Sequence, residues 1–115
     1  MPTVKVSTSK RMSAPRKEAL CLELSSAVAG ILGKPETYVQ VLVSDDAVIS
    51  FGGNVNAPSA FVAVLSIGDF AEGVTGKLSA AMGAIFAGYG IPAERLYINF
   101  CSRKGVNWGW NGSTF

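Results

Sequence analysis

Length, composition and charge limit the classes of protein to consider. The chain has 115 residues, of which 49% are hydrophobic and 16% charged, and its net charge is +2 at pH 7. This fits a single domain over residues 1–115 that is more apolar than a small monomer easily hides. The sparse basic residues argue against nucleic-acid binding, and the longest uncharged stretch, residues 47–68, is too interrupted to cross a membrane. The charged start lacks the apolar centre of a signal peptide, so we expect a cytoplasmic protein, or one secreted without a signal peptide.

The first half of the chain predicts a strand, a helix and a second strand. Residues 3–8 alternate between polar and apolar side chains, which is typical of a strand. Ser13 is a suitable cap for a helix that ends at Gly33, and Pro35 prevents its continuation. Residues 38–43 return as a strand. The helix presents a core-facing stripe at helical spacing: Leu20, Leu24, Val28 and Ile31.

The second half repeats this pattern. The segments GKPETYVQV, from Gly33, and GIPAERLYINF, from Gly90, share a glycine, a proline two residues later, a polar turn and a strand-like run. The same order of elements predicts a strand over residues 60–66, a helix over about 74–87 and a strand over 96–101. The stripe of this helix is Leu78, Met82, Ile85, Phe86 and Tyr89.

Two βαβ units predict an α+β fold of two layers, a four-stranded sheet with both helices on one face. The strands are apolar on both sides, since Phe61 and Leu65 alternate with Val62 and Val64, so the bare face needs a cover. In a chain this short, that cover is most simply another copy of the chain. We also expect a short extra strand over residues 48–51 and an irregular tail.

Histidine is absent from the chain, which removes Ser–His and Cys–His dyads and nearly every zinc site. The two cysteines, Cys21 and Cys101, form no CxxC motif and are predicted to be buried thiols. The sequence therefore gives no sign of a metal or cofactor.

Six short strings, in order along nearly the whole chain, carry a resemblance to a known family. They are MP before the first strand, LGKP at 32–35 followed by Tyr38, SFGG at 50–53, SIG at 66–68, RLYINF at 95–100 and GWNGSTF at 109–115. Together they resemble the macrophage migration inhibitory factor family. The resemblance implies a homotrimer in which three sheets form a central barrel with the helices outside. It also implies a cofactor-independent keto–enol tautomerase of the phenylpyruvate type, or the dopachrome type.

In that family the base is an amino-terminal proline, which here would be Pro2 after removal of Met1. An α-amino group titrates near ~8 in the open, and burial together with the charge of Lys34 would lower the pKa of Pro2 towards neutrality. Lys34 would attract the substrate carboxylate and the growing enolate. Each residue also has a structural interpretation, Pro2 as the start of a strand and Lys34 as a cation favourable near a helix C-terminus.

The resemblance also implies substrate contacts for Ser66 and Ile67, the latter through its backbone N–H. Tyr97 and Asn99 would reach the pocket from a neighbouring subunit. An aromatic wall suited to a small aromatic 2-keto acid would consist of Tyr38, Trp108, Trp110 and Phe115. The structural alternatives are a plain strand end, a barrel-lining pair and an apolar patch on the sheet edge.

The sequence departs from the family pattern at several positions. Ser59 and Val62 occupy the positions of a CxxC pair, so we expect no thiol oxidoreductase activity. Thr3 and Leu65 replace a methionine and a histidine, and Trp108 replaces a smaller residue, which would narrow the pocket.

Two rival functions remain open at this stage. One, implied by the resemblance, is a signalling ligand that would bind a receptor protein through Arg11 and either Asp45 or Asp46. The other is a structural trimer with a vestigial pocket.

Overall fold

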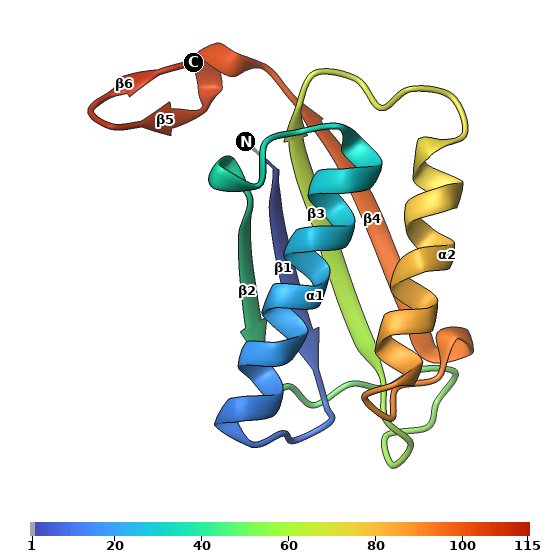
Figure 1. Ribbon diagram of the computed structural model, residues 1–115. Helices are drawn as coiled ribbons and strands as arrows, with labels where there is room; N and C mark the ends of the chain where they lie inside the picture. The colour runs from blue at the N-terminus through green and yellow to red at the C-terminus, as the bar shows by residue number, and fades with distance from the viewer. Residues whose placement is uncertain (1) are drawn as a thin grey trace.

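The computed structural model describes residues 2–115 as two layers, a four-stranded sheet covered on one face by two helices (Figure 1). Short helical turns, labelled η, complete the fold. The elements are β1 Thr3–Thr8, α1 Ala14–Leu32, η1 Glu36–Tyr38, β2 Gln40–Ser44, β3 Ala60–Ile67, α2 Val74–Ala87, η2 Ala93–Arg95, β4 Leu96–Arg103, η3 Gly105–Asn107, β5 Gly109–Trp110 and β6 Ser113–Thr114.

The sheet order is β2-β1-β3-β4, with parallel pairs at both edges and an antiparallel pair in the centre. Each parallel pair is joined through a helix, so the two predicted βαβ units and their helices on one face are confirmed. In the centre Thr3 pairs with Leu65, which brings the start of β1 to the end of β3.

Local sequence sets the ends of α1. The Ser13 Oγ accepts a hydrogen bond from the Arg16 backbone N–H at 3.3 Å, as the cap predicted. At the other end Gly33 adopts a left-handed conformation with φ 65°, and the Lys34 N–H donates to the Ala29 carbonyl at 3.0 Å. This turn fixes the direction in which Lys34 leaves the helix.

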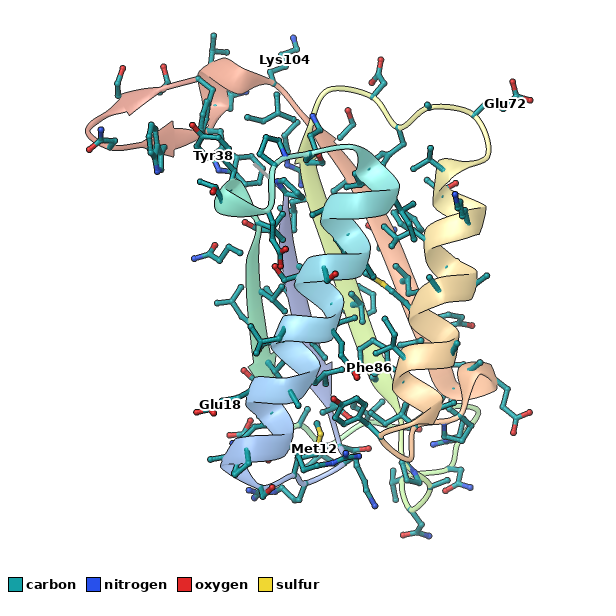
Figure 2. All side chains as sticks on the ribbon, in the orientation of Figure 1. Met12, Glu18, Tyr38, Glu72, Phe86 and Lys104 are labelled. Carbon is teal, nitrogen blue, oxygen red and sulfur yellow. The ribbon has the colours of Figure 1, made fainter. Side chains whose placement is uncertain are left out.

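The core lies between the helices and one face of the sheet. Phe86, in the last turn of α2, is fully buried there (Figure 2). Both predicted helix stripes are buried in the core, except that Ile31 and Ile85 at their margins are half-buried. The fully buried side chains include Val4, Val6, Leu20, Leu24, Val28, Val62, Val64, Leu78, Met82, Phe86 and Ile91.

Three predictions about local structure are wrong. Residues 48–51 form no strand within the described chain, because pairing there is limited to a bridge between Phe51 and Asn54 around a glycine turn. The tail folds into the β5-β6 hairpin, aided by Asn111 with φ 52° and Gly112 with φ 78°. The second strand begins at Gln40 because residues 36–38 form a 3-10 turn.

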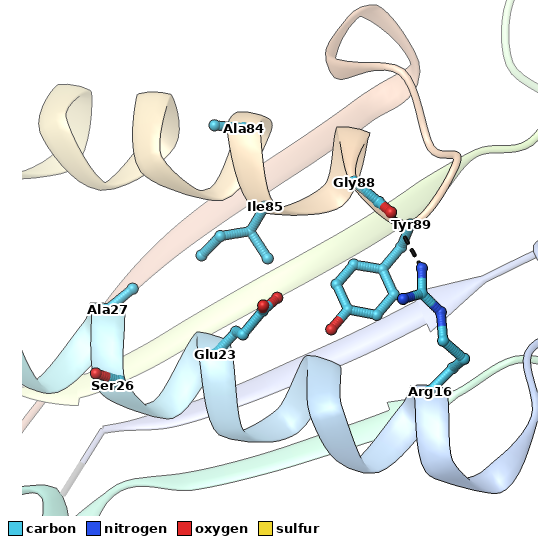
Figure 3. Close-up of a pocket in the computed structure, with 8 residues that line it drawn as sticks. All are labelled: Arg16, Glu23, Ser26, Ala27, Ala84, Ile85, Gly88 and Tyr89. Atoms are coloured by element: carbon cyan, nitrogen blue, oxygen red, sulfur yellow. Dashed lines mark hydrogen bonds between the residues drawn. The ribbon is translucent and has the colours of Figure 1, made fainter.

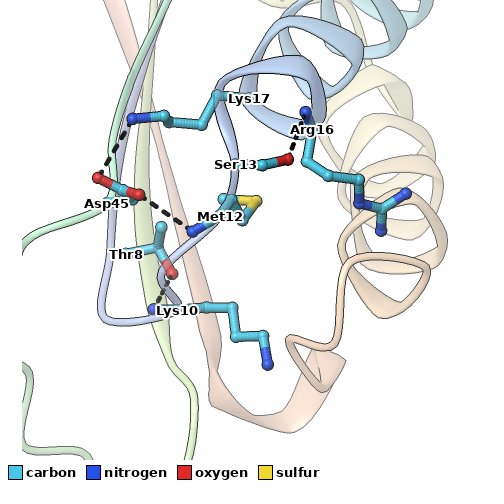
Figure 4. Close-up of polar contacts among 7 residues, drawn as sticks. All are labelled: Thr8, Lys10, Met12, Ser13, Arg16, Lys17 and Asp45. Carbon is cyan, nitrogen blue, oxygen red and sulfur yellow. Dashed lines mark hydrogen bonds and ion pairs between the residues drawn. The ribbon is translucent and has the colours of Figure 1, made fainter.

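Asp45, just after β2, joins the loop before α1 to the sheet (Figure 4). Its carboxylate accepts the Met12 N–H at 3.0 Å and lies 3.5 Å from the Lys17 ammonium. The pKa of Asp45 lies below its usual range, mainly because its carboxylate accepts the Met12 hydrogen bond. Desolvation raises this pKa, whereas the positive charges of Lys17 and Arg11 lower it further. Asp45 is therefore committed to internal contacts, whereas Asp46 beside it is exposed.

The sheet face opposite the helices carries large exposed apolar side chains. Leu42 is 42% exposed, Phe61 47% and Tyr97 65%. The predicted two-sided apolar character of the strands is thus present in the folded chain.

Cys21 and Cys101 are half-buried, not fully buried as predicted. Burial raises the pKa of the Cys21 thiol, with a smaller contribution from Glu18. Among residues 2–115, no helix has both the length and the apolar character needed to cross a bilayer.

Candidate active site

One end of the sheet gathers most of the predicted site residues. Pro2 precedes β1 at this end and is buried, and its carbonyl accepts the Gln40 N–H at 3.0 Å. The central register of β1 and β3 places Pro2 beside the last residues of β3. Met1 lies outside the described residues, so the predicted freeing of the Pro2 nitrogen stays a prediction.

Lys34 is tied to the end of β3. Its ammonium donates to the Ile67 carbonyl at 3.2 Å, and the residue is half-buried. An ammonium has three donors, so this bond holds the charge in place while other donors stay available to an anion. The contact places Lys34 and Ile67 at the same end of the sheet as Pro2.

An aromatic cavity of about 290 Å³ opens at this end. Tyr38 packs edge-on against Trp110, with ring centroids 5.5 Å apart, and against Phe115 at 6.1 Å, while Trp110 and Phe115 stack at 5.7 Å. The Phe115 N–H donates to the Trp108 carbonyl at 3.1 Å, which closes the hairpin onto the cavity. The lining residues are Thr3, Thr37, Tyr38, Val39, Gln40, Trp108, Gly109, Trp110 and Phe115.

The structure thus brings all four predicted aromatic residues together. Pro2 and Lys34 do not line this cavity themselves, but Pro2 is the chain neighbour of Thr3, which does. Sequence analysis did not assign Thr3 and Gln40 to the cavity wall, where the Thr3 hydroxyl donates to the Gln40 Oε1 at 3.2 Å. Strand alternation was the signal that could have found them, because both face away from the helices.

The remaining predicted residues do not line this cavity in the single chain. Ser66 is buried, with 3% of its surface exposed, and its side chain points towards the helix layer. Tyr97 pairs with Phe61 near the opposite end of the sheet and packs on Phe51 at 4.8 Å. Asn99 lies in the middle of β4, where its Oδ1 accepts from the Cys101 thiol at 3.0 Å.

A cleft of about 610 Å³ lies between α1 and α2 and contains none of the predicted site residues (Figure 3). Arg16, Glu23 and Tyr89 in its lining are engaged in contacts within the cleft. The Arg16 guanidinium lies 4.2 Å from the Tyr89 ring centroid and donates to the Gly88 carbonyl at 3.0 Å. Burial, reinforced by a hydrogen bond to Glu23, raises the pKa of Tyr89. We interpret this cleft as a brace between the helices.

Fold and site together define a small two-layer protein with two βαβ repeats and an aromatic cavity beside the start of its first strand. The family model of macrophage migration inhibitory factor matches residues 1–115. The chain belongs to this family, as the resemblance in the sequence indicated.

Curated relatives and solved structures agree with this assignment. A macrophage migration inhibitory factor homologue of Trichuris trichiura is 43% identical over 96 residues, covering 79% of this chain and 80% of that protein. Macrophage migration inhibitory factor of Mus musculus is 35% identical over 117 residues, covering 100% and 99%. The structure of a homologue from Prochlorococcus marinus matches with a TM-score of 0.91 at 37% identity and covers 98% of both chains.

Proposed function

We propose that the protein is a keto–enol tautomerase of small aromatic 2-keto acids such as phenylpyruvate, with Pro2 as general acid and base. The observation that carries the proposal is the meeting of Pro2, Lys34 and the aromatic cavity at one end of the sheet. Family membership adds to it. The chain contains no histidine, so the neutral secondary amine of Pro2 is the strongest candidate for a general base near this cavity.

The proton transfer follows from the chemistry of these groups. With Met1 removed, the neutral Pro2 nitrogen takes a proton from C3 of the keto acid, and the electron pair of the broken C–H bond forms the C2=C3 double bond. Negative charge moves to the C2 oxygen, which then takes a proton from solvent to give the enol. In reverse, the protonated Pro2 returns a proton to C3.

Lys34 stabilises the charge that develops in this step. Its ammonium, held by the Ile67 carbonyl, attracts the substrate carboxylate and the enolate oxygen. Burial of Pro2 disfavours its protonated form, and a nearby cation adds to this effect. The aromatic wall of Tyr38, Trp110 and Phe115 accepts the substrate ring.

The proposal includes a homotrimer. The exposed apolar residues of the sheet face, Leu42, Phe61 and Tyr97, give a reason for self-association. In a trimer, Tyr97 and Asn99 of one subunit complete the pocket of the next, which accounts for their distance from Pro2 within one chain. Sedimentation equilibrium should then give three times the 12.0 kDa chain mass.

The decisive experiment compares the processed wild type with Pro2→Gly. Mass spectrometry first establishes that Met1 is absent, and the keto–enol conversion of phenylpyruvate is then followed by ultraviolet absorbance. We expect Pro2→Gly to lose at least about a hundredfold in kcat/KM, the scale of general acid–base catalysis, with an unchanged trimer mass. Equal turnover by the two proteins would exclude Pro2 as the base.

A further inference from the structure

A second cleft lies beside the proposed active site, one strand away from Thr3. It has a volume of about 300 Å³ and is lined by Leu65, Arg103, Asn107, Trp108 and Gly109. Leu65 pairs directly with Thr3, and Trp108 and Gly109 also line the aromatic cavity. The two hollows therefore adjoin each other on either side of Trp108.

Arg103 is the cation of this cleft, and little in the folded chain engages it. Its Nη1 donates to the Ser102 carbonyl at 3.0 Å, which leaves its other N–H donors free for a ligand. Within residues 2–115, the single ion pair joins Lys17 to Asp45, so Arg103 has no carboxylate partner. The nearby Asp69 instead accepts the Ser102 hydroxyl at 3.1 Å.

This state differs from that of Arg16 and Arg95, the two other arginines whose side chains donate described hydrogen bonds. Arg95 donates to four backbone carbonyls, and Arg16 lies on the Tyr89 ring and bonds the Gly88 carbonyl. Their guanidinium groups hold the fold together. Arg103 instead makes one described side-chain hydrogen bond, to the Ser102 carbonyl, and lines a hollow together with Asn107, Leu65 and Trp108.

The strand register relates this cation to Lys34. Arg103 pairs with Ile67 in β3, and the Ile67 carbonyl holds the Lys34 ammonium. The proposed site thus has two cations at the end of β3, one that holds the 2-keto acid and one beyond Leu65 and Trp108. A substrate with an anionic group at each end would satisfy both.

We propose that Arg103 forms a second anion subsite, and that the substrates of this protein include 2-keto acids carrying a second carboxylate at the end remote from the keto group. The inference rests on the proposed tautomerase function and names the substrate class of that site. Arg103 would bind the remote carboxylate through its planar fork, which matches the geometry of a carboxylate, with the Asn107 amide as a further donor. The carboxylate takes no part in the proton transfer.

A matched pair of substrates tests the subsite. Phenylpyruvate and 4-carboxyphenylpyruvate differ by one carboxylate, and kcat/KM for each is measured for the wild type, Arg103→Met, Arg103→Lys and Lys104→Met. Lys104 is the exposed neighbouring cation, which lies at the same end of the molecule (Figure 2), so its removal is a control for general charge.

We expect Arg103→Met to lose about tenfold in kcat/KM with the carboxylated substrate, the value of one charge-assisted hydrogen bond at a partly exposed site, and less than about twofold with phenylpyruvate. Arg103→Lys should lose less, and Lys104→Met should change neither value by more than about twofold. Equal losses with both substrates, or an equal effect of Lys104→Met, would overturn the subsite.

A binding measurement separates failure of the subsite from failure of the proposed function. Phenylacetate and 4-carboxyphenylacetate, which are unreactive, are each titrated into the protein. Binding is followed by the fluorescence of Trp108 and Trp110, the two tryptophans of the chain. If the wild type turns over neither keto acid, the tautomerase proposal fails. The subsite still stands if Arg103→Met selectively weakens binding of 4-carboxyphenylacetate by about tenfold, and it falls if the two ligands respond alike.

Discussion

Replacing Arg95 with methionine should destabilise the protein more than any other single charge removal among its described contacts. The guanidinium donates through Nε to the Pro58 carbonyl at 3.0 Å, through Nη1 to Phe51 at 3.2 Å and through Nη2 to Asn54 at 2.9 Å and Ala57 at 3.0 Å. It also lies 5.4 Å from the Phe51 ring centroid. This one side chain therefore organises the whole loop between residues 51 and 58.

The magnitude follows from which carbonyls can recover water. The Asn54 bond is exposed, so its carbonyl is rehydrated at little cost, whereas the other three bonds are part-buried. With about 1 kcal/mol for each part-buried bond, Arg95→Met should lose about 3 kcal/mol of unfolding free energy. For a domain of this size that corresponds to a fall in Tm of roughly 12 °C.

The assay is thermal unfolding followed by circular dichroism at a fixed protein concentration, because association makes Tm concentration-dependent. Arg16→Met is the matched control, since it removes one exposed carbonyl bond and one ring contact and should lower Tm by only about a third as much. Arg95→Lys keeps the charge but not the fork, so it should remain close to Arg95→Met. If Arg95→Met and Arg16→Met lower Tm by the same amount, the loop does not depend on the four carbonyl contacts.

Three further predictions test the site, the electrostatics and the core. Lys34→Met should lower kcat/KM for phenylpyruvate by about a hundredfold. Its Tm should change by less than about 4 °C, because the Ile67 carbonyl that loses its partner regains water. A large loss of Tm would instead show that Lys34 has a structural role. Urea unfolding at several pH values should show a constant stability difference between wild type and Asp45→Asn above pH ~4. The difference should shrink as pH falls through the lowered pKa of Asp45, because the folded state stabilises the charged carboxylate. A difference that does not change with pH would contradict this. Leu24→Ala, at a fully buried position of α1, should cost about 3 kcal/mol in urea unfolding, against less than about 0.5 kcal/mol for the exposed Leu22→Ala.

The two-layer fold could be predicted because its signals are local and periodic. The helix stripes, the Ser13 cap and the glycine at the end of α1 each depend on neighbours within a few residues, and the structure confirms them. The strand predicted over residues 48–51 was wrong because their apolar composition resembles that of a strand, whereas no partner strand adjoins them in the described chain. The tail hairpin was missed although Asn111-Gly112 is a favoured turn pair, because the two strands that it joins have only two residues each and show no alternation.

The candidate site could be predicted only in part from the residues themselves. Resemblance to the family supplied the identities of Pro2 and Lys34, but the contact between Lys34 and Ile67 depends on how a helix end meets a strand far along the chain. The Arg103 cleft had no local signal at all, because it arises from strand pairing and from the return of the tail past β4.

The internal repeat allows the two ends of the sheet to be compared position by position. The alignment that places Pro35 on Pro92 also places Pro2 on Ser59, Lys34 on Ile91 and Tyr38 on Arg95. At the second end these positions serve the fold: Ile91 is fully buried, the Ser59 hydroxyl donates to the Arg95 carbonyl at 2.7 Å, and Arg95 binds its loop. At the first end the equivalent positions hold an imino acid, a cation and an aromatic ring beside an open cavity. Two halves with one architecture therefore carry different residue types at these three positions, which supports the roles proposed for Pro2, Lys34 and Tyr38.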